Sequence, residues 1–468
     1  MSLWLDWFRC LEALRPACTR GVTFLWMSLA LAGLSVRADL AGVTSFVRAL
    51  GLAPAAYRNL LHLFHSSAVD VERLSAAWVR LACRLFTPLR VGQRLVVVAD
   101  GLKVPKEGRK MPAVKKLHQE SANNSKPPFI SGHSCQALAL LVSGPLGRVC
   151  AVPLVSRIHE GLVFSNRDQR SLLDKLVQLL LPVAGWLGSP VVLVADAYYA
   201  SRKIALPLLE RGHHLVTRVR SNASAYRPAP RPRRPRRGRP RLYGTKLKLR
   251  KLWDEHHTFR TVRSPLPEEQ RVRIRYRCEN LLWRPVGRLV RFVWIDHPAR
   301  GRLLLMTTDL ELDPLQVLLL YSCRFRIEVS FKQALHTLGT YAYHFWMMAM
   351  TPRRRGGGDQ YLHHTSDDYR RLVRRKLAAY HRSIQLGCIA QGLLQHLALN
   401  RRKQVWRHFR GWMRTMNPDA PPSEAVAAQA LRGALPEFLL SAPDDHELKK
   451  FLLDHADLKR CVGLQLAG

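Results

Sequence analysis

Two aspartates each follow a short run of β-branched apolar residues. Asp100 ends the stretch RLVVVAD, and Asp196 ends the stretch PVVLVAD. Valine-rich runs without polar alternation are typical of strands buried on both faces. Open α/β sheets place their ligand sites at the carboxyl ends of such strands, and paired carboxylates bind hard divalent cations. The two runs therefore predict a metal-binding pair at one edge of a sheet. The alternative for each aspartate is a helix cap or a turn.

A third acidic residue lies in a segment with helical periodicity. Asp313 followed by Pro314 is a strong helix start, because aspartate caps helices well and proline fits the first turn. Four polar residues then recur every three or four positions on one stripe: Tyr321, Arg324, Glu328 and Lys332. Apolar residues fill much of the remaining circumference, so the helix is expected to be largely buried and Glu328 needs a partner. A local ion pair with Arg324 or Lys332 is the structural alternative to a chemical role.

The charge balance points to a polyanionic partner. The chain has 468 residues, with 74 Lys and Arg against 34 Asp and Glu, which gives a formal net charge of +40. This excess is too large for an ordinary solvated surface and favours nucleic acid. With 47% hydrophobic and 23% charged residues the composition is nevertheless globular. We expect a folded protein of enzyme size that binds nucleic acid.

Cysteine usage and hydropathy suggest a reducing cytoplasm. The nine cysteines are scattered and form no CxxC pair, which argues against a disulfide framework and against a structural zinc site. The apolar stretch 21–36 is shorter than the ~20 residues that span a bilayer. We interpret it as a buried helix and expect no membrane contact, with insertion into a membrane as the alternative.

The periodicities divide the chain into five segments and predict an α/β fold. Three strands, a helix, a strand, a helix and a strand follow one another after residue 90, an order similar to that of a ribonuclease-H-like mixed sheet. A β-rich insertion interrupts this sheet, and helical regions flank it. Stretches of the insertion such as 246–253 (KLKLRKLW) alternate apolar and basic residues with period two, which predicts strands with a basic face outward. The segments are a helical candidate DNA-end-binding domain (1–90), the first part of the core (91–220), a basic arm with the insertion (221–300), the second part of the core (301–350) and a basic helical region with candidate DNA or dimer contacts (351–468).

Two stretches carry most of the excess charge. The long loop after Asp100 has no periodicity of its own, and its cations are expected to lie against phosphates: Lys103, Lys106, Arg109, Lys110, Lys115 and Lys116. The low-complexity stretch 226–244, YRPAPRPRRPRRGRPRLYG, predicts an extended arm that contacts phosphates or a narrow minor groove. A plain electrostatic tether is the alternative for this arm.

Together these features resemble the DDE transposases of the insertion sequence 4 group. The resemblance rests on two strand-end aspartates, a β-rich insertion and a helix with the pattern Y-x2-R-x3-E, and it covers roughly residues 94–345. It implies that Asp100, Asp196 and Glu328 are the catalytic, metal-binding triad. It further implies that Tyr321 and Arg324 contact DNA near the cut.

One position departs from this family pattern. A lysine often stands seven residues after the glutamate, and this chain has Leu335 there. Lys332, one helical turn earlier, is the candidate replacement for a DNA contact.

The resemblance also implies a reaction and its participants. The triad would hold two Mg²⁺ ions about 4 Å apart, with Mn²⁺ as a substitute, for cleavage at the transposon ends and attack of the 3′-OH on target DNA. The implied partners are double-stranded DNA, as terminal inverted repeats and target, and a second copy of the chain in a homodimeric synaptic complex. The implied location is the nucleoid of a bacterial-type cytoplasm. The alternatives are a ribonuclease-H-like nuclease without strand transfer and a catalytically inert DNA-binding protein.

Overall fold

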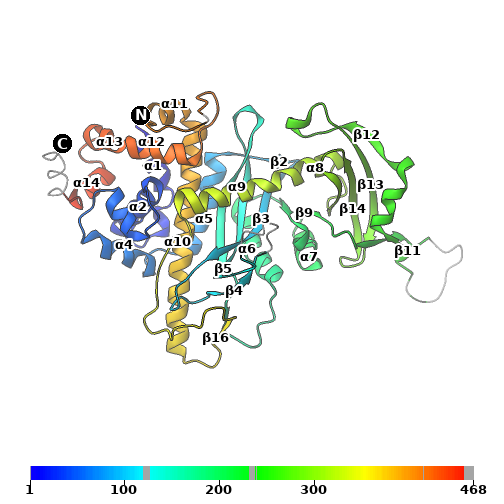
Figure 1. The fold of residues 1–468 in the computed structure, drawn as a ribbon, viewed down its shortest axis with the longest axis horizontal. Coiled ribbons are helices and arrows are strands. Elements are labelled where there is room, and N and C mark those ends of the chain that lie inside the picture. Colours follow the sequence, from blue (N-terminus) through cyan, green and yellow to red (C-terminus); the bar gives the residue numbers. More distant parts are fainter. Residues whose placement is uncertain (1, 120–126, 231–237, 239, 415, 458–468) are drawn as a thin grey trace. The chain divides into compact units, whose positions relative to one another are not determined.

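The protein is a mixed α/β protein with a large mixed sheet, as the sequence predicts (Figure 1). The computed structural model describes residues 2–119, 127–230, 238, 240–414 and 416–457. The chain forms two compact units, which are described separately below. Unit 1 comprises Met1–Pro88, Gly101–Gln169 and Ile327–Gly468, and unit 2 comprises Leu89–Asp100 and Arg170–Arg326. The helical segments expected at the two ends of the chain therefore both fall in unit 1.

The sheet of unit 2 has a parallel part and an antiparallel part. The parallel part runs from the first half of β3 (Arg94–Pro105) through β8 (Val191–Ala195) to β9 (His214–Arg218). Every residue of β8 is buried, as expected for a valine-rich central strand. The antiparallel part continues from β9 through β15 (Gly301–Thr307), β14 (Arg288–His297), β13 (Arg273–Trp283), β10 (Ser224–Pro228) and β11 (Tyr243–Lys248), while β12 (Arg260–Arg263) pairs with β13 and β2 (Arg90–Val91) with β3.

The described part of unit 2 contains three α-helices, and their ends follow the expected signals. Helix α6 (Leu172–Leu187) begins with a capping box of Ser171 and Asp174 and ends at Gly188 in the left-handed conformation. Helix α7 (Arg202–Leu209) precedes β9, and α8 (Pro314–Ser322) follows β15. The predicted strand, helix, strand, helix, strand order of this part is confirmed.

The β-rich insertion has the expected strands with one difference. The stretch 246–253 does not continue as a strand, because a 3₁₀ turn begins at Leu249 and extends to Asp254. The first and last parts of the predicted arm pair as β10 and β11, so the arm joins two antiparallel strands. Residues 231–237 and 239 of the arm, and residues 120–126 of the loop after Asp100, lie outside the described residues.

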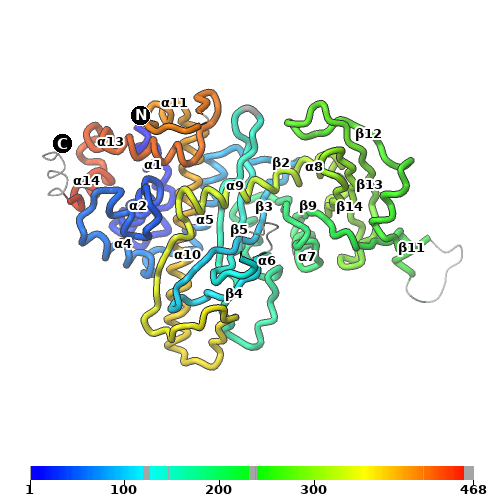
Figure 2. The backbone as a smooth tube through the Cα atoms, in the orientation of Figure 1, coloured from blue at the N-terminus to red at the C-terminus, as the bar shows by residue number. Residues whose placement is uncertain are grey.

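Unit 1 is organised around the long helix α10 (Asp367–Asn400), which Figure 2 shows beside α2, α4 and α5. Its amino-terminal helices and its later ones are α1 (Leu3–Glu12), α2 (Gly21–Val36), α3 (Val43–Ala49), α4 (Ala56–His65), α5 (Val71–Leu85), α9 (Arg326–Gln333), α11 (Arg402–His408), α12 (Glu424–Gly433), α13 (Leu435–Ser441) and α14 (Glu447–Asp454). Its strands are β1 (Thr87–Pro88), the second half of β3, β4 (Lys115–His118), β5 (Phe129–Ser143), β6 (Val149–Ile158) and the small pair β7 (Leu162–Val163) and β16 (Gln360–Tyr361). The predicted helical character of residues 1–90 is confirmed.

Strand β3 is longer than the sequence predicts. The valine run was expected to stop at Asp100, whereas the strand continues to Pro105. The added residues alternate between exposed and more buried positions, which is the pattern of a strand with one solvated face. Asp100 therefore lies within β3, at the point where the strand passes from unit 2 into unit 1.

Among the described residues, no helix combines the length and the apolar character needed to cross a bilayer. The apolar stretch 21–36 is helix α2, with eleven of its residues buried inside unit 1. The interpretation of this stretch as a buried helix is confirmed.

Two helical glycines differ in the space around them, and this difference predicts opposite effects of alanine substitution on stability. Gly392 lies at the contact between α5 and α10. A Cβ on Gly392 would lie 2.2 Å from the buried Trp78 ring, whose Nε1 donates to the Pro153 carbonyl at 2.8 Å. We expect Gly392→Ala to lower the free energy of unfolding by ~1–3 kcal/mol through overpacking. Gly185→Ala in α6 is the matched control, because a Cβ there meets nothing within 4 Å. That change should raise stability by ~0.5–1 kcal/mol. Urea unfolding measures both, and equal effects of the two substitutions would contradict the packing argument.

Candidate active site

Parallel pairing of β3 with β8 sets the two aspartates at the same level. Val98 faces Val194 in the register, and Asp100 and Asp196 each lie two residues further along. Because side chains alternate along a strand, a step of two brings both aspartates to the side of the sheet on which that valine pair lies. Continuation of this register by two residues places Asp100 and Asp196 at neighbouring positions within unit 2, and their binding of a metal stays a prediction.

Asp196 is held by backbone groups. Its Oδ1 accepts a hydrogen bond from the Tyr198 amide at 2.9 Å, so the side chain caps the 3₁₀ turn Ala197–Tyr199. Its carbonyl oxygen accepts a hydrogen bond from Thr217 Oγ1 on the adjacent strand β9 at 2.6 Å. The capping role considered from the sequence thus exists, and it fixes the carboxylate at the end of β8.

Asp100 is held by a cation. Arg324 Nη1 lies 3.0 Å from Asp100 Oδ2, and the two side chains are 20% and 19% exposed. Arg324 follows α8 in a short 3₁₀ turn, Cys323–Phe325. The helical run that carries it starts as predicted, because the Asp313 side chain accepts hydrogen bonds from the Leu315 and Gln316 amides. The stripe residue Arg324 is thereby brought to the first aspartate.

Tyr321 interacts with charged groups near each of the two aspartates, Arg324 beside Asp100 and the Asp196 carboxylate itself. Burial raises the pKa of its phenol, the guanidinium groups of Arg324 and Arg218 oppose this rise, and the Asp196 carboxylate adds to it. The same side chain is hydrogen-bonded to Arg324. Tyr321 therefore links the neighbourhoods of the two aspartates, and its phenol keeps its proton through the neutral pH range.

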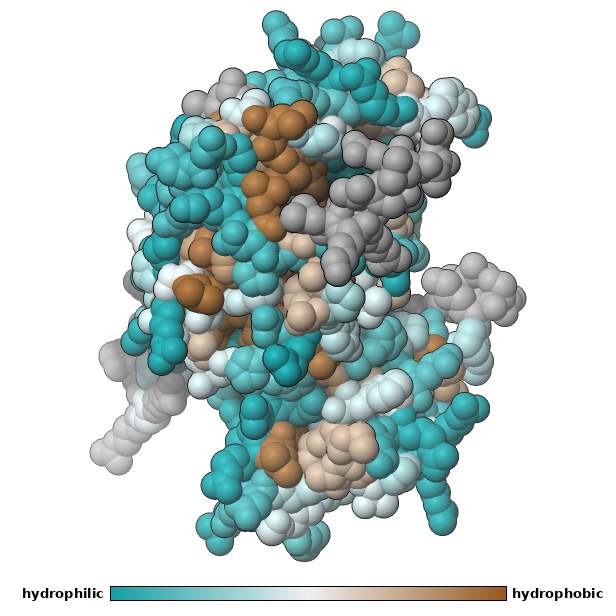
Figure 3. Space-filling model, turned by 90° about the vertical axis from the view of Figure 1, so that its left-hand side faces the viewer, coloured by the Kyte–Doolittle hydropathy of each residue, from teal (hydrophilic) through white to brown (hydrophobic). Residues whose placement is uncertain are grey.

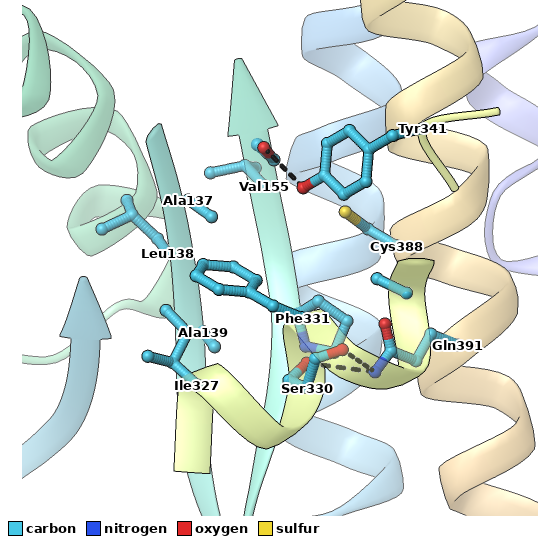
Figure 4. Close-up of a pocket in the computed structure, with 13 residues that line it drawn as sticks. Ala137, Leu138, Ala139, Val155, Ile327, Ser330, Phe331, Tyr341, Cys388 and Gln391 are labelled. Carbon is cyan, nitrogen blue, oxygen red and sulfur yellow. Dashed lines mark hydrogen bonds between the residues drawn. The ribbon is translucent and has the colours of Figure 1, made fainter. Parts of the chain in front are cut away.

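Glu328 belongs to unit 1, in the first turn of α9. The helix is anchored by its neighbours, because Ile327 is 1% exposed and Ser330 is 5% exposed. Figure 4 shows Ser330, Phe331 and Ile327 packed among residues of β5, β6 and α10 around a cavity of about 10 Å³. Gln391 Nε2 of α10 donates to both the carbonyl and the hydroxyl of Ser330 at 3.0 Å. These contacts fix the helix that carries Glu328.

The expected single helix from Asp313 onward is in fact segmented. Helix α8 ends at Ser322, a 3₁₀ turn follows, α9 covers Arg326–Gln333, and a π-helical turn covers Ala334–Leu338. Departures of this kind from α geometry often mark functional sites. In the described part of the chain, no three His, Cys, Asp or Glu side chains are gathered closely enough to hold a metal ion.

The predicted DNA-contacting cations differ in their surroundings. Lys103, Arg109, Lys116 and Lys332 are exposed, and Lys110 is half-buried. Lys115 forms ion pairs with Glu160 at 3.3 Å and Asp359 at 2.9 Å. Lys106 is 5% exposed, and its ammonium donates to backbone carbonyls of unit 1. Its charge is therefore not presented at the surface.

A basic pocket that the sequence did not reveal lies where β9 and β15 meet the insertion. It has a volume of about 390 Å³, and its lining includes one indole, one carboxylate and four cations: Trp253, Asp254, Arg218, Arg250, Lys251 and Arg302. Trp253 stacks on Phe259 at 5.6 Å, and the Arg302 guanidinium lies 5.3 Å from the Trp253 ring centre. The alternating basic pattern of these strands predicted an outward basic face. It could not indicate which segments meet at the pocket.

The fold and the paired carboxylates are those of a ribonuclease-H-like domain, and a family comparison agrees. Residues 15–283 match the DDE superfamily endonuclease family. The match covers more than half of the chain, so the chain belongs to this family. It includes Asp100 and Asp196 and most of the helical segment 1–90, and it ends before Tyr321, Arg324 and Glu328. Endonucleases of this superfamily use divalent metal ions. No curated protein matches the chain.

The Asp100–Arg324 ion pair predicts a stability effect in unit 2. We expect Arg324→Met to lower the free energy of unfolding by about 1–3 kcal/mol, because a charge-assisted hydrogen bond to a largely buried carboxylate is lost. Arg371→Met is the matched control, since Arg371 pairs with Asp368 and the two side chains are 77% and 80% exposed. That substitution should leave chemical denaturation unchanged. Equal free energies of unfolding for the two variants would show that the Asp100–Arg324 ion pair adds nothing to stability.

Proposed function

We propose that this protein is a DNA transposase of the insertion sequence 4-like group. It would cut the ends of its element and join each 3′-OH to target DNA by metal-dependent phosphoryl transfer. The observation that carries the proposal is the register of β3 and β8, which sets Asp100 and Asp196 side by side. Membership in the DDE superfamily endonuclease family and the position of Tyr321 and Arg324 beside this pair support it.

The metal ligands in this proposal are Asp100, Asp196 and Glu328. All three donors are carboxylates, and an oxygen-only set suits Mg²⁺, with Mn²⁺ as a substitute, better than zinc. Two such ions would activate the attacking oxygen and stabilise the leaving 3′ oxygen. Asp100 and Asp196 fit this role within unit 2, and the anchored helix α9 supplies Glu328 from unit 1.

Two residues of unit 2 would act on the phosphate. Tyr321 keeps its proton because burial raises its pKa, so the phenol can donate a hydrogen bond to a phosphate oxygen. The Arg324 guanidinium balances Asp100 in this structure, and its planar fork suits a phosphate as well as a carboxylate. Both groups would orient the scissile bond and offset negative charge that develops on it.

The remaining contacts would be electrostatic. We assign phosphate contacts to the surface cations Lys103, Arg109, Lys110, Lys116 and Lys332, with Lys115 in a weaker role because two carboxylates already pair with it. Lys106 is left out because it is buried. The DNA would be the terminal inverted repeats and the target, bound by a homodimer in a synaptic complex within the nucleoid of a bacterial-type cytoplasm.

A nuclease without strand transfer is the second candidate. The description of the matched family favours it, because that description names an endonuclease activity. The two candidates share every carboxylate and every cation discussed above. They differ only in the fate of the 3′-OH after cleavage.

Single substitutions of the three carboxylates test the catalytic assignment. We expect Asp100→Asn, Asp196→Asn and Glu328→Gln each to lower Mg²⁺-dependent cleavage of the repeat ends by more than about 100-fold, because each removes a metal ligand. Asp313→Asn is the matched control, since asparagine also caps helices and Asp313 only starts α8. Wild-type cleavage in any one of the three test variants would refute the triad.

A joining assay separates the two candidates. Precleaved repeat ends with a free 3′-OH are incubated with the protein, supercoiled plasmid and Mg²⁺. Transposition predicts covalent joining of the labelled end to the plasmid, and Asp196→Asn should abolish this product. Plasmid nicking without joining would support the nuclease instead.

A further inference from the structure

Two segments that are far apart in sequence form one platform in unit 1. Residues 106–116 follow β3, and residues 343–358 follow the π-helical turn after α9. The Met347 amide donates to the Lys110 carbonyl and the Arg353 amide to the Arg109 carbonyl, both at 2.9 Å. The Lys116 amide donates to the Gly357 carbonyl at 2.8 Å. We call residues 106–116 and 343–358 the basic platform.

The buried side chain of Lys106 links the first segment of the platform to the backbone at the start of the second segment. Its ammonium donates to the Tyr341 carbonyl and, at 2.9 Å, to the Tyr343 carbonyl, and it lies 4.0 Å from the centre of the Tyr343 ring. Burial lowers the pKa of Lys106 to about 8. A lysine buried in this way holds backbone in place and has no charge to offer a surface ligand.

The platform presents two large apolar side chains to solvent. Trp346 is 62% exposed and Met348 is 82% exposed, whereas Met347 and Met350 are 5% and 4% exposed. The buried methionines pack with Leu362 and Val373 and form a fixed base. The outward position of Trp346 and Met348 is therefore set by packing beneath them and by the backbone hydrogen bonds to residues 109 and 110.

Cations lie on both segments of the platform that carries this apolar pair. Arg109, Arg354 and Arg355 are exposed, and Lys110 Nζ lies 3.3 Å from the Met348 carbonyl. Trp346 lies against the same loop, because a Cβ on Gly108 would be 3.3 Å from Trp346 Nε1. The platform also carries Glu107, which is exposed, while nearby Asp359 is paired with Lys115. The exposed charged residues of the platform are thus mainly cationic.

From this arrangement we infer that Trp346 and Met348 form a wedge for the bases of DNA. The surrounding cations bind backbone phosphates, and the indole stacks on a base at an opened or kinked step while Met348 fills the space beside it. Apolar side chains that enter between base steps and aromatic side chains that stack on unpaired bases are established modes of nucleic-acid recognition. The inference deepens the proposed function, on which it rests for the identity of the polyanion.

Exposure of apolar groups alone does not carry this inference. The face drawn in Figure 3 is mostly hydrophilic, and hydrophobic side chains interrupt it in separate places. Leu440 on α13 is 85% exposed, but its neighbourhood in sequence is acidic or neutral, with Glu437, Asp444 and Asp445. An apolar pair on segments rich in cations, in contrast, matches both the charge and the stacked bases of DNA.

DNA binding by the full chain in EDTA tests the wedge without cleavage. The probes are fluorescein-labelled duplexes of one sequence, either fully paired or with a short central mismatched bubble. We expect Trp346→Ala to lower the affinity for the bubbled duplex about tenfold and to leave the paired duplex nearly unchanged, since one stacked base is lost. Trp346→Phe should keep most of the preference, and Met348→Ala should lose part of it. A 2-aminopurine placed in the bubble should be quenched by the wild type and not by Trp346→Ala.

Other variants separate the wedge from general binding and from folding. Arg354→Gln with Arg355→Gln should weaken both duplexes equally and reduce the slope of log affinity against log salt by about two. Leu440→Ala should change neither duplex, and thermal melting should be the same for Trp346→Ala and the wild type. An unchanged bubble preference in Trp346→Ala would overturn the wedge. So would loss of self-association in Trp346→Ala, measured by sedimentation, without a change in DNA binding. Absence of cleavage by the wild-type protein in the triad experiment would overturn the proposed function and leave a measured bubble preference standing.

Discussion

The parallel pairing of β3 with β8 is the constraint on which the candidate active site depends. Four valine and leucine pairs fix the register of the buried first half of β3 against the fully buried β8, and a slip of one residue would turn each side chain to the other face. The same register that fills the core therefore decides that Asp100 and Asp196 lie at one level. Because both faces of these apolar runs are buried, core packing fixes the backbone from which the two carboxylates extend.

Glu328, the third carboxylate of the proposed triad, is positioned by the contacts that hold α9 in unit 1. Two of the passages from unit 2 into unit 1 lie inside continuous secondary structure. One is in β3, directly after Asp100, and the other is in α9, directly after Arg326. Glu328 follows the second crossing by two residues, and Ser330 is bonded to Gln391 in the middle of α10. Hydrogen bonds between buried polar groups are costly to break, so α9 is tied to the scaffold of unit 1 and not only to its own chain.

The sequence predicted the secondary-structure elements better than the contacts between elements that are distant in sequence. The valine runs, the Asp313 cap and the alternating basic strands predicted the correct type of element, because these patterns depend on local periodicity and capping. Residues whose role depends on distant neighbours could not be assigned in this way. Lys106 and Arg109 are three positions apart in one basic loop, yet only Lys106 is buried, because Tyr341 and Tyr343 supply carbonyls from a segment more than two hundred residues away. The continuation of β3 beyond Asp100 likewise depends on where β5 lies.

The two aspartates also differ in electrostatic character, although their flanking sequences are alike. Asp196 receives a hydrogen bond from a neutral backbone amide, which orients the carboxylate and leaves its negative charge available to a cation. Asp100 is paired with a guanidinium, whose positive charge attracts the carboxylate and would repel a divalent ion. In a chain with a net charge of +40, a carboxylate near the surface is readily paired with arginine. Within unit 2, Asp196 is thus the ready half of the pair. In the proposed mechanism, Asp100 would become a metal ligand only when Arg324 moves to another anion, for which a DNA phosphate is the natural candidate.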